Sequence, residues 1–415
     1  MHNRVSPDGG CVAVFRPPWH QTGLPRWLFY YIVISMLAPI MLVPFRMRWK
    51  GLENVPRSGS FLLLGNHSSL LDPFWDFWLL LRPAGFMASA QLFRTPVAAW
   101  LLDAVGVFPK KKFVKDRASM EVLNNFIERG QPVGLFPEGT RSFDGRIGRV
   151  LPGIGRLTKR LDTSLVFVRN TTGHLCLPRW AVYPRFVPIH LEYEGPISFP
   201  PEATAEEIAA FVKEKITIQH DRKAPRWSFG FRMAHGLPVW LWACPQCFEL
   251  DSLSPAPRNG NVIRCHSCQA AWRVDVSCRL SGRGQTPDTT VWVANDAVIA
   301  HFGNPPVADR ARFAETSIIL DELGSIGELK RGGTPQPIGS GRLTLLEDRM
   351  ALFTPDGVRE LWSLPLPDIV AISVEISNLL QIRTTDSLYQ IAPSQGSTIK
   401  WAHFMRPWCT GLRKK

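Results

Sequence analysis

Between residues 51 and 218, short apolar runs alternate with segments in which apolar residues recur at helical spacing. This pattern predicts strands at residues 60–65, 84–88, 106–108, 132–136, 165–168 and 186–192, and helices at 74–81, 96–104, 121–129 and 206–218. Strands that alternate with helices are typical of an α/β sheet covered on both faces. We therefore expect an α/β domain over residues 51–232.

One long apolar run precedes this domain. Residues 27–45 contain no charge, and basic residues flank both ends. In helical form, 19 residues reach about 28 Å, close to the hydrocarbon thickness of a bilayer. Because Pro39 and Pro44 favour kinks, the segment can either span the membrane or dip into one leaflet, and a buried core helix is the alternative. We expect a membrane anchor at 27–50, after an N-terminal segment at 1–26 with no signal-peptide pattern.

The pattern changes to a period of two near the C-terminus. Residues 282–288 have linker composition. Beyond them we expect strands at 289–293, 298–302, 318–320, 342–346, 350–353, 369–374, 379–383 and 388–391, followed by a helix at 397–407. Residues 285–415 are therefore predicted to form a β-rich domain.

The chain is long and basic. Its 415 residues suggest two or three domains, and 45% of them are hydrophobic, which favours a folded protein. A net charge of +13 favours a partner rich in negative charge, and 15 Trp with 24 Phe suit a protein that meets lipid. A nucleic-acid partner is not expected, because the basic residues are spread along the whole chain rather than gathered in one stripe.

Two C-x-x-C pairs predict a metal site. Cys244 and Cys247 are separated by 17 residues from Cys265 and Cys268, which is zinc-ribbon spacing. Four thiolates imply a structural Zn²⁺, so we expect a zinc ribbon over residues 240–282. Thiolate zinc sites and unpaired cysteines suit a reducing compartment.

Two motifs carry candidate chemistry. In the first, His67 follows the predicted strand 60–65, and Asp72 lies five positions later. A carboxylate there can hold one imidazole nitrogen protonated and leave the other free to accept a proton, although a structural His–Asp pair is the alternative. In the second, Glu138-Gly139-Thr140-Arg141 follows the strand 132–136. Its glycine permits a tight turn, and its arginine offers a planar fork suited to phosphate.

Together, the motifs N-H-x4-D and F-P-E-G-T-R-S resemble those of the glycerolipid acyltransferases, the family that includes 1-acyl-glycerol-3-phosphate acyltransferase. The resemblance covers residues 27–220 and implies an α/β domain with a mixed sheet flanked by helices. A further family block is matched by 106–112, with Lys112 where the family commonly has Arg. The last block, at 165–170, supplies a strand without the usual proline, which leaves the acceptor open.

The resemblance also implies a mechanism without a catalytic cofactor. His67, oriented by Asp72, would deprotonate the free hydroxyl of a lysophospholipid, which would attack an acyl-CoA or an acyl carrier protein thioester. Lys112 and Arg141 would hold the acceptor phosphate. Glu138, with its neighbours Gly139 and Thr140, would support the substrate site.

The order of strands and a final helix in residues 285–415 resembles a pleckstrin-homology (PH) or GRAM module. Such modules bind lipid headgroups or protein partners, and a purely structural role is the alternative.

We therefore interpret the chain as a membrane-associated O-acyltransferase with its catalytic domain on the cytoplasmic side. The acceptor expected first is 1-acyl-glycerol-3-phosphate, which would give phosphatidate. The alternatives are another lyso-lipid, an amino-acid-derived lipid, or a non-enzymatic lipid-binding adaptor.

Overall fold

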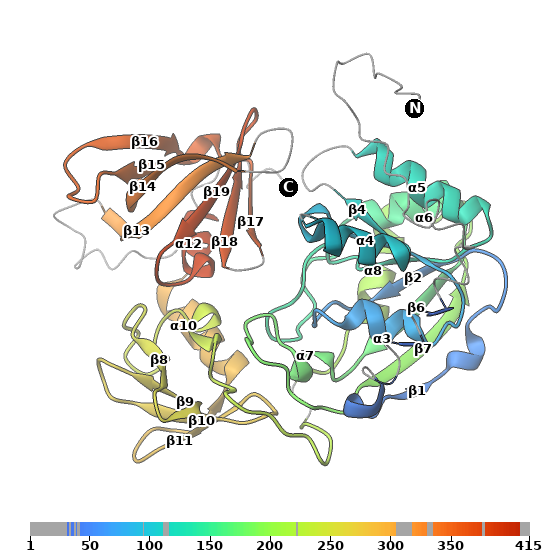
Figure 1. Ribbon diagram of the computed structural model, residues 1–415, viewed down its shortest axis with the longest axis horizontal. Helices are drawn as coiled ribbons and strands as arrows, with labels where there is room; N and C mark the ends of the chain where they lie inside the picture. The colour runs from blue at the N-terminus through green and yellow to red at the C-terminus, as the bar shows by residue number, and fades with distance from the viewer. Residues whose placement is uncertain are drawn as a thin grey trace.

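The computed structural model describes the chain from residue 31 to residue 406, apart from 33–34, 37–38, 40–41, 94, 111–115, 221–222, 304–317, 330–334 and 376–377. It has three sheets, one in each part of the chain (Figure 1). The first sheet lies with its helices on one side of the view. The five-stranded sheet of the cysteine-rich region and the C-terminal sheet lie on the other side.

The first sheet is mixed, as the α/β interpretation requires. Its order is β1-β7-β6-β2-β5-β3-β4, and only the β6–β7 pair is antiparallel. The strands are β1 (Arg48–Lys50), β2 (Leu62–Gly65), β3 (Gly85–Ser89), β4 (Val107–Lys110), β5 (Val133–Leu135), β6 (Leu165–Asn170) and β7 (His190–Ile197). Strand β2 is central and wholly buried, which explains its uninterrupted apolar sequence.

Helices cover this sheet. They are α3 (Asp72–Trp78), α4 (Pro96–Ala104), α5 (Arg117–Glu128), α6 (Gly153–Leu161), α7 (Gly173–Cys176) and α8 (Ala205–Ile216), with short 3₁₀ turns η1 (Leu52–Asn54) and η2 (Ala90–Phe93). Helix α8 begins with a capping box, in which the Thr204 hydroxyl accepts from Glu207 N and the Glu207 carboxylate accepts from Thr204 N. Its residues Ile208, Val212 and Ile216 enter the core.

The predicted anchor at 27–50 is only partly described. Within the part of the chain that the structure describes, no helix is both long and apolar enough to cross a membrane. The C-terminal end of the prediction is corrected: Arg48–Lys50 form strand β1 rather than the anchor, and Phe45 is buried in the domain core. Parallel pairing with β7 places β1 in the sheet. Residues 1–30 lie outside the described residues.

The second sheet belongs to the cysteine-rich region and is wholly antiparallel. Its order is β12-β11-β10-β9-β8, built from β8 (Leu253–Ala256), β9 (Asn259–Cys265), β10 (Ala271–Val274), β11 (Arg279–Gly282) and β12 (Thr289–Thr290). The short helix α9 (Leu237–Trp240) precedes it. The segment expected to be a linker, 282–288, is instead a turn of this sheet, and Trp272 Nε1 donates to Pro287 O over 3.0 Å.

The strands predicted at 289–293 and 298–302 are wrong for the most part. Apart from β12, this stretch is the helix α10 (Val291–Phe302), which the Thr290 hydroxyl caps by accepting from Val293 N. Val291, Ala294, Val298 and Phe302 are buried, at the spacing of one helical face. Burial of that face prevails over the β-propensity of the valines and isoleucine in the segment.

The third sheet has seven antiparallel strands in the order β16-β15-β14-β13-β19-β18-β17. They are β13 (Ile318–Leu329), β14 (Pro335–Leu346), β15 (Arg349–Phe353), β16 (Glu360–Pro365), β17 (Ala371–Glu375), β18 (Leu379–Arg383) and β19 (Leu388–Pro393), with η3 (Leu366–Asp368) between β16 and β17. Strand β16 was not predicted. The chain then forms helix α12 (Thr398–Met405), and Trp401 of this helix is buried in the core of the sheet.

The three parts pack against one another. One continuous core contains Val187 and Leu191 of the first part together with Cys244 and Trp272 of the second. Helix α12 is joined to the second part because the buried Lys400 forms an ion pair with Asp251.

Candidate active site

The candidate site lies at one edge of the first sheet. Strands β6, β2 and β5 are neighbours and run parallel, so their carboxyl ends meet at the same edge. His67 follows β2, Glu138 follows β5, and Asn170 ends β6. Ligands of open α/β sheets bind outside the carboxyl ends of the strands, and the sequence motifs converge there.

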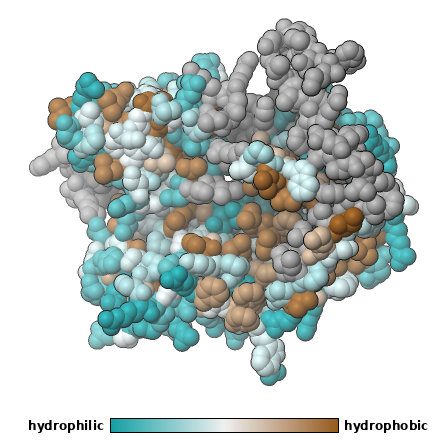
Figure 2. Space-filling view, viewed as in Figure 1, coloured by the Kyte–Doolittle hydropathy of each residue, from teal (hydrophilic) through white to brown (hydrophobic). Residues whose placement is uncertain are grey.

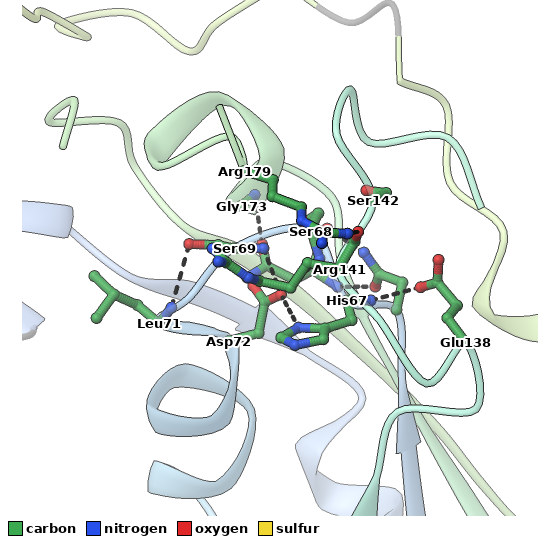
Figure 3. Close-up of polar contacts among 12 residues, drawn as sticks. His67, Ser68, Ser69, Leu71, Asp72, Glu138, Arg141, Ser142, Gly173 and Arg179 are labelled. Carbon is green, nitrogen blue, oxygen red and sulfur yellow. Dashed lines mark hydrogen bonds and ion pairs between the residues drawn. The ribbon is translucent and has the colours of Figure 1, made fainter. Parts of the chain in front are cut away.

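His67 and Asp72 form a hydrogen-bonded pair (Figure 3). The distance from His67 Nδ1 to Asp72 Oδ2 is 3.1 Å. The same carboxylate oxygen accepts from Ser68 N and Ser69 N, each over 2.7 Å, and the Asp72 side chain is fully buried at the start of α3. Because an ionised carboxylate only accepts, Nδ1 carries the proton and Nε2 is left as a base.

A buried amide network fixes the other oxygen of Asp72. Asn170 Nδ2 donates to Asp72 Oδ1 over 3.1 Å, while Asn170 Oδ1 accepts from Gly173 N over 2.8 Å. Asn66 pairs with the backbone of Asn170 through two hydrogen bonds. A Cβ on Gly173 would lie 2.9 Å from Asp72 Oδ1 and 2.6 Å from Asn170 Nδ2, so this position requires glycine.

The His67 ring lies in a largely apolar, positively charged setting. It stacks on Phe136, with ring centroids 3.9 Å apart and planes 4° apart, and its side chain is 18% exposed. Burial lowers the pKa of His67 from its ordinary value, Asp72 opposes this, and Arg141 and Arg179 lower the pKa further. Because the pKa of His67 is lowered, its imidazole is neutral at pH 7 and is able to accept a proton.

Glu138 joins the two motif loops. Its Oε1 accepts from His67 N over 2.7 Å, and its Oε2 accepts from Gly148 N over 3.1 Å. Burial raises the pKa of Glu138 to about 7, although these two hydrogen bonds oppose the shift. Gly139 has φ +69 in the turn after Phe136, a conformation that glycine adopts without strain. Glu138 therefore positions the backbone around His67.

Two arginines face this site. Burial lowers the pKa of Arg141, and burial followed by the charge of Arg141 lowers the pKa of Arg179 to about 10. Arg179 Nη1 donates to Thr140 Oγ1 over 2.8 Å and to Arg141 O over 2.9 Å, and its guanidinium lies 4.2 Å over the ring of Phe143. Because the charge of Arg141 acts on Arg179, the two guanidinium groups lie near each other, and we name this pair the candidate anion site.

Arg179 also reaches the third sheet. Its Nη2 donates to Val374 O of strand β17, and Glu375 is the negative charge that acts on it there. The C-terminal domain is therefore in direct contact with a residue of the candidate site.

Most of the predicted site residues come together. His67, Asp72 and Glu138 are joined by hydrogen bonds, and Gly139, Thr140 and Arg141 belong to the same loop. Lys112 lies outside the described residues. Lys110, at the end of β4, lines an open depression whose other charged residues are Asp116, Arg117, Glu121 and Arg160.

Sequence reasoning missed Asn170, Gly173 and Arg179. Asn170 is the last residue of β6, just beyond the predicted strand, so its position at the sheet edge was a usable signal. Arg179 lies in a loop with no motif, and only the tertiary structure brings it beside Arg141.

The four predicted zinc ligands also come together. The sulfur atoms of Cys244, Cys247, Cys265 and Cys268 all lie within 4.8 Å of one another. The Cys244–Cys268 and Cys247–Cys265 distances are 3.8 and 3.7 Å, and a tetrahedral Zn²⁺ with its usual bonds separates sulfurs by about 3.8 Å. Gln246 N and Cys268 N donate to ligand sulfurs. The cluster therefore fits a structural zinc ion.

Comparison with known proteins assigns the first domain. Residues 46–169 match the family model described as Acyltransferase. The chain therefore contains an α/β acyltransferase domain, and both sequence motifs lie within it.

Two curated relatives are similar to part of the chain. It is 30% identical over 146 residues to the chloroplastic 1-acyl-sn-glycerol-3-phosphate acyltransferase LPAT1 of Arabidopsis thaliana, and 34% identical over 146 residues to BAT2 of Brassica napus. Each match covers 34% of this chain, and it spans 40% and 42% of those relatives. A solved 1-acyl-sn-glycerophosphate acyltransferase, PlsC from Thermotoga maritima, matches 46% of this chain and 75% of its own, with 22% identity and a TM-score of 0.36.

Proposed function

We propose that this protein is an O-acyltransferase that moves an acyl group from an acyl thioester to the free hydroxyl of a lysophospholipid. The acceptor we propose first is 1-acyl-glycerol-3-phosphate, giving phosphatidate. The observation that carries the proposal is the pair of His67 and the buried Asp72 at the carboxyl edge of an acyltransferase-family sheet. The printed names of the relatives support the choice of acceptor.

In the proposed reaction, His67 Nε2 takes the proton of the acceptor hydroxyl as its oxygen attacks the thioester carbonyl carbon. The tetrahedral intermediate collapses, the C–S bond breaks, and the imidazolium returns the proton to the thiolate of coenzyme A or acyl carrier protein. Asp72 keeps Nδ1 protonated and stabilises the transient imidazolium. No acyl-enzyme is needed.

The anion site supports a phosphorylated acceptor. Arg141 and Arg179 present two positive charges beside His67, and Lys112 is proposed to add a third. A phosphate held there would place the neighbouring glycerol hydroxyl within reach of the base. This is catalysis by orientation, since the anchored end of the acceptor fixes its reacting end.

The other parts of the chain are proposed to serve attachment and recruitment. We propose a Zn²⁺ on the four cysteines, with a structural role. Seven antiparallel strands followed by a packed helix support the interpretation of the C-terminal domain as a PH- or GRAM-like module for a lipid headgroup or a protein partner. We propose that the apolar run at 27–45 attaches the enzyme to the membrane, with the catalytic domain on the cytoplasmic side.

The proposal is tested by comparing acceptors with and without phosphate. We expect wild-type protein to acylate lysophosphatidate much faster than monoacylglycerol, and Arg141→Met to reduce this preference through a higher KM. The matched control is Arg156→Met, which removes an exposed arginine of α6. Equal use of both acceptors by wild-type protein would contradict the phosphate site, and a panel of other lyso-lipids would then identify the acceptor.

A further inference from the structure

A surface loop carries three exposed aromatic side chains at alternate positions. In the loop 226–232, which we name the aromatic loop, Trp227 is 73% exposed, Phe229 is 60% exposed and Phe231 is 50% exposed. Large apolar side chains that cluster on a surface mark a site of interaction. Figure 2 shows apolar residues gathered across the middle and lower part of the face drawn, between hydrophilic residues.

The backbone holds these side chains outward. Trp227 and Arg232 have φ values of 68° and 52°, a left-handed conformation that is uncommon for such residues. The Ser228 hydroxyl closes a turn by donating to Pro225 O over 2.6 Å. Phe229 and Phe186 exchange two backbone hydrogen bonds of 2.8 and 3.2 Å. Strained residues that the surrounding structure enforces are concentrated at functional sites.

The aromatic loop is also basic. The Arg226 guanidinium lies 5.5 Å from the ring centroid of Trp227, and the Arg232 guanidinium lies 5.6 Å from that of Tyr183. Both arginines are exposed. The adjacent chain segments, 178–190 and 223–236, contain no Asp or Glu. The surface therefore offers apolar rings and positive charge together.

This loop lies where the apolar run at 27–45 meets the folded domain. Arg46 Nη2 donates to Trp227 O over 2.6 Å. The ring of Phe45 stacks on Phe186 with centroids 6.0 Å apart, and Phe186 stacks on Phe229 with centroids 4.9 Å apart. One continuous aromatic contact thus joins the end of the apolar run to the aromatic loop.

We infer that the aromatic loop docks the protein on an anionic phospholipid bilayer. Trp and Phe side chains enter the interface between headgroups and acyl chains, and Arg226 and Arg232 contact headgroup phosphates. The partner is a bilayer because three exposed aromatic side chains and two exposed arginines share one short loop next to the end of the apolar run. This inference goes beyond acyl transfer and does not depend on it, since vesicle binding requires no turnover.

The location of the contact is tested by photocrosslinking in the full chain. Benzoylphenylalanine replaces Phe231 or, as a matched control, Val358, which is also exposed but lies in the turn between β15 and β16. Protein bound to vesicles of phosphatidylcholine and phosphatidylglycerol is irradiated, and lipid adducts are measured by mass spectrometry. We expect adducts at 231 and none at 358. Bound protein without adducts at 231, or protein that does not bind, would overturn the inference.

The charge contribution is tested with paired substitutions. Arg226→Ala with Arg232→Ala is expected to weaken partitioning into these vesicles roughly 30-fold at low salt, at about 1 kcal/mol for each arginine. The control, Arg156→Ala with Arg359→Ala, removes two exposed arginines elsewhere and should change partitioning less than about two-fold. Equal losses in both double variants, or no loss in the first, would contradict specific docking through this loop. Phosphatidylcholine vesicles should show little difference between the variants.

Discussion

Exchange of the two side chains in the Asp72–Asn170 pair tests the geometry of the site. Asp72 Oδ2 accepts from Ser68 N, Ser69 N and His67 Nδ1, while Oδ1 accepts from Asn170 Nδ2. In Asp72→Asn, the amide keeps its oxygen toward the backbone donors, so its nitrogen faces Asn170 Nδ2. In Asn170→Asp, two carboxylates face each other. In the double variant, the new amide at position 72 donates to the new carboxylate at position 170, and every hydrogen bond is restored.

The structure sets the expected magnitudes. In Asp72→Asn, the new amide nitrogen at position 72 and Asn170 Nδ2 are two buried donors without acceptors. Each costs about 1–3 kcal/mol, so the variant should lose about 2–6 kcal/mol of unfolding free energy. The exchanged pair should recover most of this loss, because the carboxylate at 170 also keeps the hydrogen bond from Gly173 N. Activity should not recover. Without a carboxylate on Nδ1 of His67, turnover should remain about 10²- to 10⁴-fold low.

The assay combines denaturant unfolding with acyl-transfer kinetics on wild type, both single variants and the double variant. We expect the double variant to be more stable than either single variant and to remain as inactive as Asp72→Asn. A double variant no more stable than Asp72→Asn would refute the described network. Full activity in the double variant would refute the role of a carboxylate at position 72.

The remaining predictions concern pH and metal. Because the pKa of His67 is lowered from 6.5, the acidic limb of the pH profile of kcat/KM should lie below pH 6.5. Arg179→Met removes a positive charge near His67 and should therefore move this limb to higher pH. An unmoved limb would argue against the proximity of Arg179 and His67. The pKa of Glu138 is raised from 4.5 to about 7, so the folded protein retains a proton that the unfolded chain releases, and the unfolding free energy should fall as pH rises from 4.5 to about 7. That slope should be smaller in Glu138→Gln, as pH-dependent unfolding would show. Elemental analysis should find one zinc per chain. The double variant Cys247→Ser with Cys268→Ser should lose this zinc and have a lower Tm than wild type. Wild-type protein that is folded without metal, and whose Tm does not change when zinc is added, would contradict the zinc site.

Local sequence patterns predicted much of the secondary structure of the first domain. Helix α4 has the predicted limits, and the strands β2, β5 and β6 have strong apolar runs because they are buried on both faces. The motif residues His67 and Asp72 could be paired from spacing alone, since a turn and the start of a helix separate them. The resemblance to the acyltransferases then assigned both motifs to one substrate site, and the structure places them at one sheet edge.

What the sequence did not predict depends on tertiary contact. Helix α10 was mistaken for strands because its β-branched residues outweighed a helical spacing that becomes clear only when its buried face is known. Asn170 appeared to be an ordinary end of a strand, and its amide acquires a role only beside the buried Asp72. Arg179 is brought to the site by a loop whose position depends on Phe143 and on strand β17.

The most direct measurement of the central claim is acyl transfer from labelled acyl-CoA and acyl carrier protein to a panel of lyso-lipids, with wild type and His67→Ala compared. His301→Ala, a substitution in α10, is the matched control. The account predicts turnover in wild type and in His301→Ala, with lysophosphatidate as the best acceptor, and loss of turnover in a folded His67→Ala. Unchanged turnover in His67→Ala, or no transfer to any acceptor by folded wild-type protein, would contradict it.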